Sequence, residues 1–550
     1  MGGDEGNRVR YHSLDALRAF MMLLGLVFHA QWMLQPTYFW NARADVQGHE
    51  FAHYFFGWVH VFRMQAFILI AGFFAHLLIA KRGVPSFLVN RTYRVLLPFV
   101  AAMVVFFPIL RWQGLRGGIQ TGRIQTSDGL WDHTIRHFSG LPEKIGQEWP
   151  YHFWFLETLC LLYLITLALR FVCQHVVDRS GALRAGIQRV FEVISESPWC
   201  IPTLSIPVAA MLLWDNTWFG ITSGPLNPEW VGTFNYWFIF AVGWCLYVRP
   251  ELITRAARFW KTKMVVGSVI ALLLAGVFFN DWSTHRNRVG PSGVAWNLTA
   301  VADSAKMREE LLAEDDSPLG ELRAEVRSRI SAEFLAFIRE TGDWSSDQKF
   351  GVVDQFNSRI IDATDLATVE RCLALGLDQD PRWGEWVVLP MTDRPESVRK
   401  PINEALLRLA LPESVHAGTP RELGDSVAYF YAYALSTWLL IQAWLGFFEE
   451  YFSTQSQKVR YYSDAAYWLY ILHVPVQFEM SLWMGDLVWP TAIKFLLYSA
   501  GPLVVGVPTY HYLVRSTWVG KWLNGRRYPR EPFWQSAVLP YEGDTESGSK

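Results

Sequence analysis

Runs of about twenty apolar residues, the length that a helix needs to cross a bilayer, recur along the chain between shorter polar segments. The first run has no small-residue cleavage site and contains Arg18, so we expect it to remain as the first span. The pattern predicts an all-α, polytopic membrane helical bundle of about ten spans. The predicted spans are 16–36, 54–79, 95–112, 153–173, 199–214, 231–249, 263–281, 426–448, 464–485 and 491–514.

Residues 285–425 interrupt this pattern, because they are long, polar and rich in charge. Within them Leu322, Val326 and Ile330 recur at helical spacing and predict an apolar helix face. We therefore expect an inserted extracytoplasmic helical domain, which either decorates the fold or helps to grip a substrate. The predicted parts are 1–284 with the first seven spans, 285–425 as the insert, 426–515 with the last three spans and 516–550 as a cytoplasmic tail.

Lysine and arginine concentrate in alternate short loops, such as 80–94 and 250–262, whereas the outer loops 37–52 and 215–230 hold few. The basic segment 113–150 departs from this distribution. Because cytoplasmic loops carry an excess of positive charge, the distribution predicts a multi-pass protein of a bacterial inner membrane with both termini in the cytoplasm.

The composition agrees with a chain that faces lipid. Of its 550 residues 51% are hydrophobic and 18% are charged, and its 27 tryptophans suit the two membrane interfaces. A net charge of -2 gives no indication of a nucleic-acid partner. The five cysteines have no paired spacing, so we expect neither a disulfide framework nor a zinc knuckle.

Three polar residues stand in the first span, DALRAFMMLLGLVFHA, where a charge is costly unless it faces a protein interior. Arg18 and His29 are eleven positions apart, about three helical turns, so they share a face with Asp15 and with the small Gly25. One interpretation is a catalytic face that runs from the inner interface into the membrane. The other is an arginine anchor paired with Asp15 and a histidine satisfied in the core.

Other polar residues lie in or beside later spans. The two arginines of RTYR, one turn apart at the mouth of the third span, could grip phosphates or could simply anchor the helix. The residues concerned are His60 and Arg63 in the second span, Arg91 and Arg94 before the third, His152 at the start of the fourth and His473 in the ninth.

Two other classes of function also fit parts of the sequence. HEFAH at 49–53 matches the H-E-x-x-H zinc signature of metalloproteases, but no convincing third ligand accompanies it, so we predict no metal site. Polar faces inside spans also line the pathways of transporters, although the spans have no evident inverted repeat.

Taken together, five motifs resemble the acyltransferase type 3 membrane family. Arg18 and His29 match its R-x10-H signature, and Arg91 and Arg94 match its R-x-x-R. The resembling stretches are LDALR…H in the first span, FRMQAFILIAGFF in the second, RTYR before the third, HFWFL at the fourth and YILHVPV near the end.

The resemblance implies an O-acyltransferase that transfers groups other than amino-acyl groups. Acyl-CoA would serve as a co-substrate from the cytoplasmic side, with no other cofactor, and a succinyl or acetyl group would pass to a hydroxyl of a periplasmic or cell-surface glycan. His29 would act as a base or carry the acyl group. Arg91 and Arg94, with Arg18, would bind the donor, and His60, Arg63, His152 and His473 would contact the acyl group or the acceptor.

Overall fold

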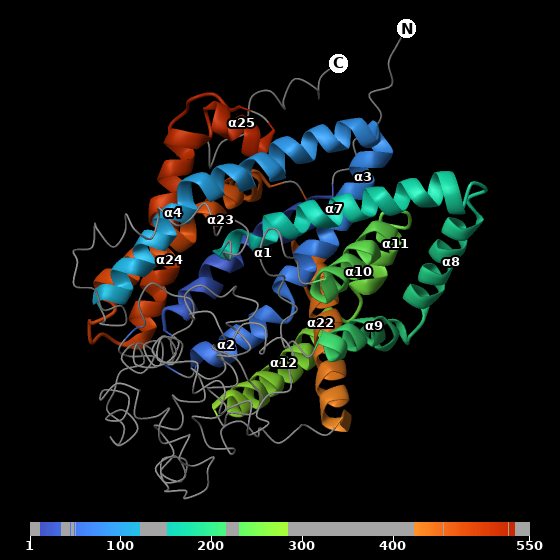
Figure 1. Ribbon diagram of the computed structural model, residues 1–550, viewed down its shortest axis with the longest axis horizontal. Helices are drawn as coiled ribbons and strands as arrows, with labels where there is room; N and C mark the ends of the chain where they lie inside the picture. The colour runs from blue at the N-terminus through green and yellow to red at the C-terminus, as the bar shows by residue number, and fades with distance from the viewer. Residues whose placement is uncertain are drawn as a thin grey trace, which may run out of the picture.

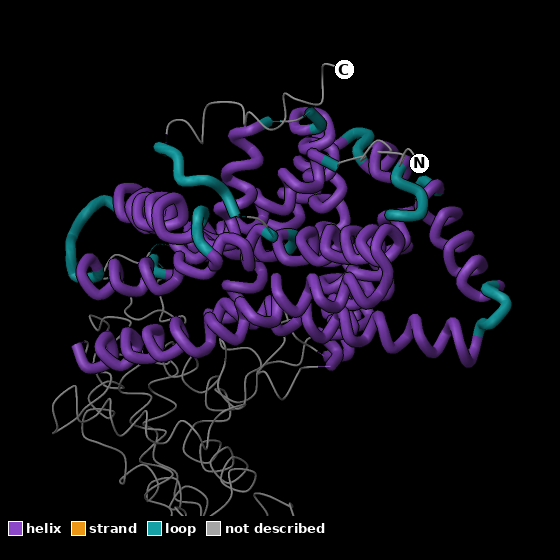
Figure 2. Tube along the Cα trace, turned by 90° about the horizontal axis from the view of Figure 1, so that it is seen from above, coloured by secondary structure: helices purple, strands orange, loops and turns teal. Residues whose placement is uncertain are grey.

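The computed structural model describes residues 11–34, 45, 49, 51–120, 151–215, 230–283, 423–454, 456–525 and 527–533. These residues form a bundle of helices with no strand among them, which confirms the all-α prediction (Figures 1 and 2). The predicted insert lies outside the described residues up to position 422, so its predicted fold and location stay predictions.

The described helices succeed one another along both halves of the chain. The first half contains α1 (His12–Trp32), α2 (Phe51–His60), α3 (Arg63–Arg91), η1 (Thr92–Leu96), α4 (Leu97–Gln120), η2 (Tyr151–Phe153), α7 (Trp154–Val172), η3 (Cys173–Val177), α8 (Ala182–Glu196), α9 (Cys200–Asp215), α10 (Trp230–Leu246), α11 (Glu251–Ala256) and α12 (Trp260–Ser283). The second half contains α22 (Leu423–Phe452), α23 (Gln457–Met484), α24 (Thr491–Thr509), η5 (Tyr510–Val514) and α25 (Trp518–Asn524).

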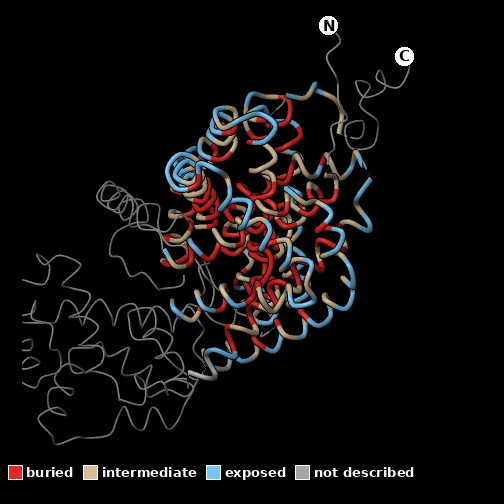
Figure 3. Tube along the Cα trace, turned by 90° about the vertical axis from the view of Figure 1, so that its right-hand side faces the viewer, coloured by how far each residue is buried: buried red, intermediate tan, exposed pale blue. Residues whose placement is uncertain are grey.

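Several of these helices are suited to a membrane. Within the described residues five helical stretches are long and apolar enough to cross one, or six if the sharply bent pair of α8 and α9 counts as one span. Each predicted span overlaps a helix, but the count of ten is not confirmed. Large apolar side chains such as Val104, Leu164 and Val504 are exposed on the outside of the bundle, as lipid contact requires, and buried residues gather inside (Figure 3).

The second span differs from the continuous helix that the sequence predicts. The chain breaks at Val61 and Phe62 between α2 and α3, and the Thr437 hydroxyl of α22 donates a hydrogen bond to the Val61 carbonyl at 2.9 Å. A backbone break inside a bundle is tolerated when a neighbouring side chain satisfies the freed carbonyl. As a consequence, Arg63 lies in the first turn of α3.

The segment 80–94, which the sequence predicts as an inner loop, has a non-helical kink at Gly83 and helical backbone on either side of it. Helix α3 continues through it to Arg91, the π-helical turn η1 follows, and α4 begins at Leu97. Gly83 has non-helical backbone angles, φ 76° and ψ 169°, that are open to glycine, so α3 consists of two helical parts that meet at a kink there. Arg91 and Arg94 lie on helical backbone beyond this kink.

Helix α1 lies at the centre of the bundle, where it packs against α23, α22, α24 and α3. Its first residues lie beside the end of α22, because the Ser13 hydroxyl donates to Glu449 Oε2 at 2.7 Å. The opposite end of the bundle holds a buried ion pair, in which Lys494 Nζ of α24 contacts Asp45 Oδ1 at 2.7 Å. We call these the Ser13 side and the Lys494 side.

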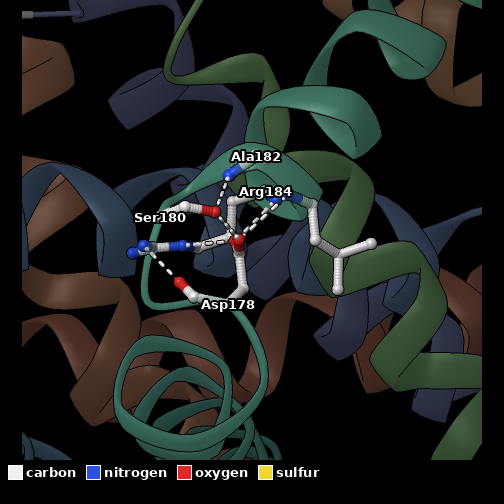
Figure 4. A network of polar contacts seen from close by, with 5 residues as sticks. Asp178, Ser180, Ala182 and Arg184 are labelled. Atoms are coloured by element: carbon white, nitrogen blue, oxygen red, sulfur yellow. Dashed lines mark hydrogen bonds and ion pairs between the residues drawn. The ribbon is translucent and has the colours of Figure 1, made fainter.

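The start of α8 is fixed by a side-chain cap (Figure 4). Asp178 accepts hydrogen bonds from the backbone N–H groups of Leu183 at 3.0 Å and Arg184 at 2.9 Å, and its carboxylate also pairs with the Arg184 guanidinium at 3.0 Å. These donors satisfy the helix start and stabilise the charged form, so they hold the pKa of the Asp178 carboxyl at about 2, below its usual range.

Candidate active site

Helix α1 presents the polar face expected from the sequence. Because it is continuous from His12 to Trp32, the eleven-residue step from Arg18 to His29 corresponds to a rise of about 16 Å. Arg18 forms an ion pair with Asp15 at 3.3 Å near the Ser13 side. His29, 4% exposed, lies toward the other end, where its ring stacks on Trp32 at 4.1 Å between centroids.

Two histidines from other parts of the chain lie next to His29, and we call the three residues the histidine cluster. The ring centroid of His29 lies 4.9 Å from that of His473 of α23 and 6.2 Å from that of His152 of η2. His152 and His473 lie 4.9 Å apart, and all three side chains are buried. Three imidazoles in one buried space form an unusual concentration of groups that accept and donate protons.

Backbone carbonyls of α23 orient two of these rings, and Pro475 frees one of these carbonyls. A proline has no N–H to donate, so the carbonyl of Ile471, four residues earlier in α23, lacks its helical partner. His152 Nε2 bonds to that carbonyl at 3.3 Å, and His473 Nδ1 bonds to the Tyr470 carbonyl at 2.6 Å.

These contacts determine which ring nitrogens carry protons. Since a carbonyl only accepts hydrogen bonds, the proton sits on Nε2 of His152 and on Nδ1 of His473 when these rings are neutral. The other nitrogens, Nδ1 of His152 and Nε2 of His473, then carry lone pairs, and neither has a hydrogen-bond partner among the described residues. His29 Nδ1 also lacks such a partner, so the cluster offers three ring nitrogens to a ligand.

Arg63 places a positive charge beside the cluster. Its guanidinium lies 4.6 Å from the centre of the Phe28 ring and so close to Gly25 that an added Cβ there would meet Nη1 at 2.5 Å. Glycine at position 25, one turn before His29, therefore makes room for the guanidinium. Arg63 acts electrostatically on all three rings of the cluster.

His60 does not join the three rings. It stacks on Phe56 with centroids 5.2 Å apart, and its Nδ1 lies 3.4 Å from the Tyr433 hydroxyl of α22. Among the residues predicted for acyl or acceptor contact, the structure therefore brings His152, His473 and Arg63 next to His29 and leaves His60 behind Phe28.

A second group of cations, the arginine cluster, lies toward the Ser13 side. Arg94 lies within electrostatic range of Arg18 and Arg91, and all three arginines lie within electrostatic range of Tyr163. The Arg91 guanidinium lies 5.3 Å from the Tyr163 ring centre, and Arg94 donates to the Leu523 carbonyl of α25 at 3.2 Å. Three like charges held together favour an anionic ligand.

Tyr467 and Tyr470, which the sequence analysis did not single out, lie between the two clusters. Tyr467 is an electrostatic neighbour of Arg94, its ring lies 6.4 Å from that of Tyr470, and Tyr470 lies 6.0 Å from His473. The Tyr470 hydroxyl also donates to the His152 carbonyl. The signal that could have revealed them is the spacing of Tyr467, Tyr470 and His473, three residues apart on one face of α23.

The H-E-x-x-H motif is only partly described. His49 Nδ1 accepts a hydrogen bond from the Phe51 N–H at 3.0 Å, whereas Glu50 and the His53 side chain lie outside what the structure describes. Within the described residues no group of three or more potential ligands is placed to hold a metal ion.

Comparison with known proteins identifies the class to which this helical bundle and its two clusters belong. The chain matches the family description "Acyltransferase domain" over residues 11–301 and belongs to that family. It is therefore a multi-pass membrane acyltransferase, and the predicted resemblance is confirmed.

Curated relatives give a more particular similarity. The chain is 31% identical over 94 residues to glucans biosynthesis protein C of Salmonella paratyphi B, Salmonella heidelberg and Salmonella dublin. The match covers 17% of this chain and 24% of each relative, so the chain spans about a quarter of the length of these proteins. The stretches LDALRAFMMLLGLVFH and VHVFRMQAFILIAGFF carry the resemblance to that protein in the sequence. No solved structure matches the chain.

Proposed function

We propose that this protein transfers a succinyl or acetyl group from acyl-CoA, bound from the cytoplasmic side of a bacterial inner membrane, to a hydroxyl of a periplasmic or cell-surface glycan. Membership of the acyltransferase family supports the reaction type. The name of the curated relatives, glucans biosynthesis protein C, supports a glucan as the acceptor. The distribution of lysine and arginine along the chain supports cytoplasmic termini.

The observation that carries this proposal is the arrangement of the two clusters along α1. The arginine cluster lies toward one side of the bundle and the histidine cluster lies deeper, about 16 Å along the helix, with Tyr467 and Tyr470 between them. Acyl-CoA has phosphates at one end and a thioester at the other, and this separation suits the distance between the two clusters. The guanidiniums of Arg18, Arg91 and Arg94 would hold the phosphates, and the thioester would reach the imidazoles.

The histidine cluster supplies the proton transfers of an acyl transfer. We assign His29 as the general base that takes the proton of the acceptor hydroxyl as its oxygen attacks the thioester carbonyl. Collapse of the tetrahedral intermediate breaks the C–S bond, and the leaving thiolate takes up the proton from the His29 imidazolium. The lone pairs of His473 Nε2 and His152 Nδ1 would accept hydrogen bonds from the other hydroxyls of the acceptor.

A covalent route uses the same residues in another order. His29 would attack the thioester itself, release CoA and pass the acyl group from its ring nitrogen to the acceptor. An acyl-imidazole that accumulates on His29 when the acceptor is withheld would distinguish this route from general-base catalysis.

Transfer of radiolabel from succinyl-CoA or acetyl-CoA to a glucan in isolated membranes tests the proposed function. His29→Ala should lower the rate by about 10²–10⁴-fold, the usual contribution of a general base. The matched control is His175→Ala, because His175 lies exposed on η3. A fully active His29→Ala protein would overturn the assignment, and solute flux without acyl transfer would favour a transporter.

A further inference from the structure

A cavity of about 330 Å³ lies apart from both clusters, lined by residues of α3, α8, α9, α10, α11, α12 and α22. No residue of the histidine cluster or the arginine cluster lines it, and neither does Arg63. Its volume lies within the range of pockets that hold small organic ligands. The acyl-transfer chemistry leaves this cavity without a role.

The inner part of the cavity is apolar. Leu69, Leu204, Val242 and Leu246 line it from three helices, and Trp438 of α22 lies beside them with its indole N–H bonded to the Leu204 carbonyl at 2.9 Å. Since the one polar group of Trp438 is satisfied by the backbone, the wall offers no hydrogen bond from that ring. Such a surface suits a hydrocarbon chain.

The mouth of the cavity is cationic. Arg255, Arg258 and Lys263 line it, and among the described residues none of the three is ion-paired with a carboxylate. Lys263 donates to the Gln442 side chain at 2.7 Å, and Arg255 donates to the backbone carbonyl of Glu196. These positive charges are therefore not neutralised by their protein contacts.

The nearby acidic side chains are already engaged by a different arginine. Arg249 lies 3.2 Å from Glu192, 3.6 Å from Glu196 and 3.6 Å from Glu251. Arg249 does not line the cavity. The charges at the mouth thus remain available to an anion that approaches from outside.

Two observations place the mouth at a membrane interface. Phe259 lines it with 75% of its surface exposed and a positive φ of 58°, a conformation that costs energy for a bulky residue. An exposed aromatic ring held in this way suits the boundary between headgroups and chains. The mouth also lies on the Ser13 side, because the neighbouring Trp260 donates to Glu450, next to the Ser13 partner Glu449.

We infer that this cavity binds one acidic phospholipid of the surrounding bilayer, with a hydrocarbon chain among the leucines and the phosphate on Arg255, Arg258 and Lys263. Basic pockets between helices at a membrane interface recognise acidic headgroups in this way. The lipid would come from the leaflet at the Ser13 side. The site shares no residue with the proposed acyl-transfer site, so the two proposals are tested independently of each other.

Native mass spectrometry of the full-length protein in detergent tests the inference, with phosphatidylglycerol and phosphatidylethanolamine as probes. We expect one phosphatidylglycerol retained per chain, with an apparent affinity about tenfold or more above that for phosphatidylethanolamine. The double variant Arg255→Glu/Arg258→Glu should abolish this preference. Lys261→Glu is the control for a single charge reversal at this end of the bundle, because Lys261 lies two residues from Lys263 but does not line the cavity.

Four results would overturn the inference: no retained lipid, equal binding of both lipids, an equal loss in the Lys261→Glu protein, or displacement of the lipid by millimolar glycerol phosphate. The last result would mean that an anion alone fills the site. Ala256→Phe, which introduces a ring at the cavity wall without a change of charge, provides a second variant. It should lower phosphatidylglycerol retention even if the arginine variants fold poorly.

Discussion

Arg63 is the residue whose position gives the most specific expectation about the donor. If the transferred group is succinyl, its free carboxylate needs a cation near the thioester, and the Arg63 guanidinium lies beside the histidine cluster. Arg63→Met should therefore lower kcat/KM for succinyl-CoA by about 10–100-fold, the range expected for a lost charged hydrogen bond, and affect acetyl-CoA much less. Steady-state kinetics with both donors would measure this.

A substitution at Gly25 tests the role of Arg63 in a second way, by moving its guanidinium. In Gly25→Ala the new Cβ would displace the Arg63 guanidinium without removing its charge, so the selectivity should shift in the same direction. Gly186→Ala is the control, because a Cβ at that position meets no atom within 4 Å. Equal losses with both donors would contradict the role of Arg63 in recognising the carboxylate.

At the scale of residues, the sequence predicted which side chains could take part in the reaction better than it predicted which of these side chains lie next to each other. Helical spacing placed Arg18 and His29 on one face, because α1 is a regular helix without a break. Spacing could not show that His152 and His473 lie beside His29, since that contact depends on how α23 and η2 pack against α1. The stacking of His60 on Phe56 depends on packing in the same way.

Helix α23 has a proline in its interior, and the carbonyl that this proline leaves free contacts His152. In Pro475→Ala the new N–H would donate to the Ile471 carbonyl and compete with His152 Nε2. We expect the variant to be more stable, because a proline in a helix interior costs up to about 3 kcal/mol, but less active, by about tenfold. Thermal unfolding and acyl transfer, measured on the same preparation, should show a higher unfolding temperature together with a lower rate of transfer.

The matched control for this change is Pro108→Ala in α4, a proline inside a helix that does not orient a histidine. It should gain stability without losing activity. Parallel losses of activity in both variants would mean that His152 does not depend on the freed carbonyl.

Asp178 caps the start of α8, and we expect the stability of this helix start to depend on pH over a defined range. The folded state holds the pKa of Asp178 at about 2, below the ordinary value for an aspartate, so the cap contributes fully above about pH 4. As the pH falls from 4 towards 2 the carboxylate takes up a proton and this contribution is lost. Hydrogen exchange at the amides of Leu183 and Arg184, corrected for the intrinsic rate, should accelerate over that range.

Asp178→Ala should show the faster exchange already at neutral pH and should lose the pH dependence. Amides in the middle of α8, such as that of Val190, serve as the internal control. Unchanged exchange at Leu183 in the variant would show that the helix start is held without the carboxylate, by the Arg184 bond to the backbone carbonyl of residue 178 or by the Ser180 hydroxyl.

Element boundaries were the part of the fold that the sequence predicted least well. Hydropathy located a helix for every predicted span but did not reveal the break at Val61, because the Thr437 hydroxyl that satisfies it is far away in the chain. It also predicted a loop at 80–94, since charged residues there resemble a turn between spans. The structure has a non-helical kink at Gly83 within this segment, but the residues on either side of it are helical.

For the whole molecule, the proposed reaction requires the two sides of the bundle to face different compartments. The arginine cluster lies toward the Ser13 side and would face acyl-CoA in the cytoplasm. The Lys494 side, toward which His29 lies, would face the glycan. Labelling of single cysteines in intact cells with a membrane-impermeant reagent tests this orientation, with Ser456 and Val488 as positions on either end of α23.

In a Cys372→Ser background, Val488→Cys should react in cells whose outer membrane is permeable, because the side chain is 77% exposed just after α23. Ser456→Cys, just before α23, should react only after the inner membrane is lysed. The four described native cysteines are partly buried, and the labelling of the protein without an introduced cysteine gives their background signal. The reverse pattern would put the histidine cluster toward the cytoplasm, and a periplasmic glycan could then not be its acceptor.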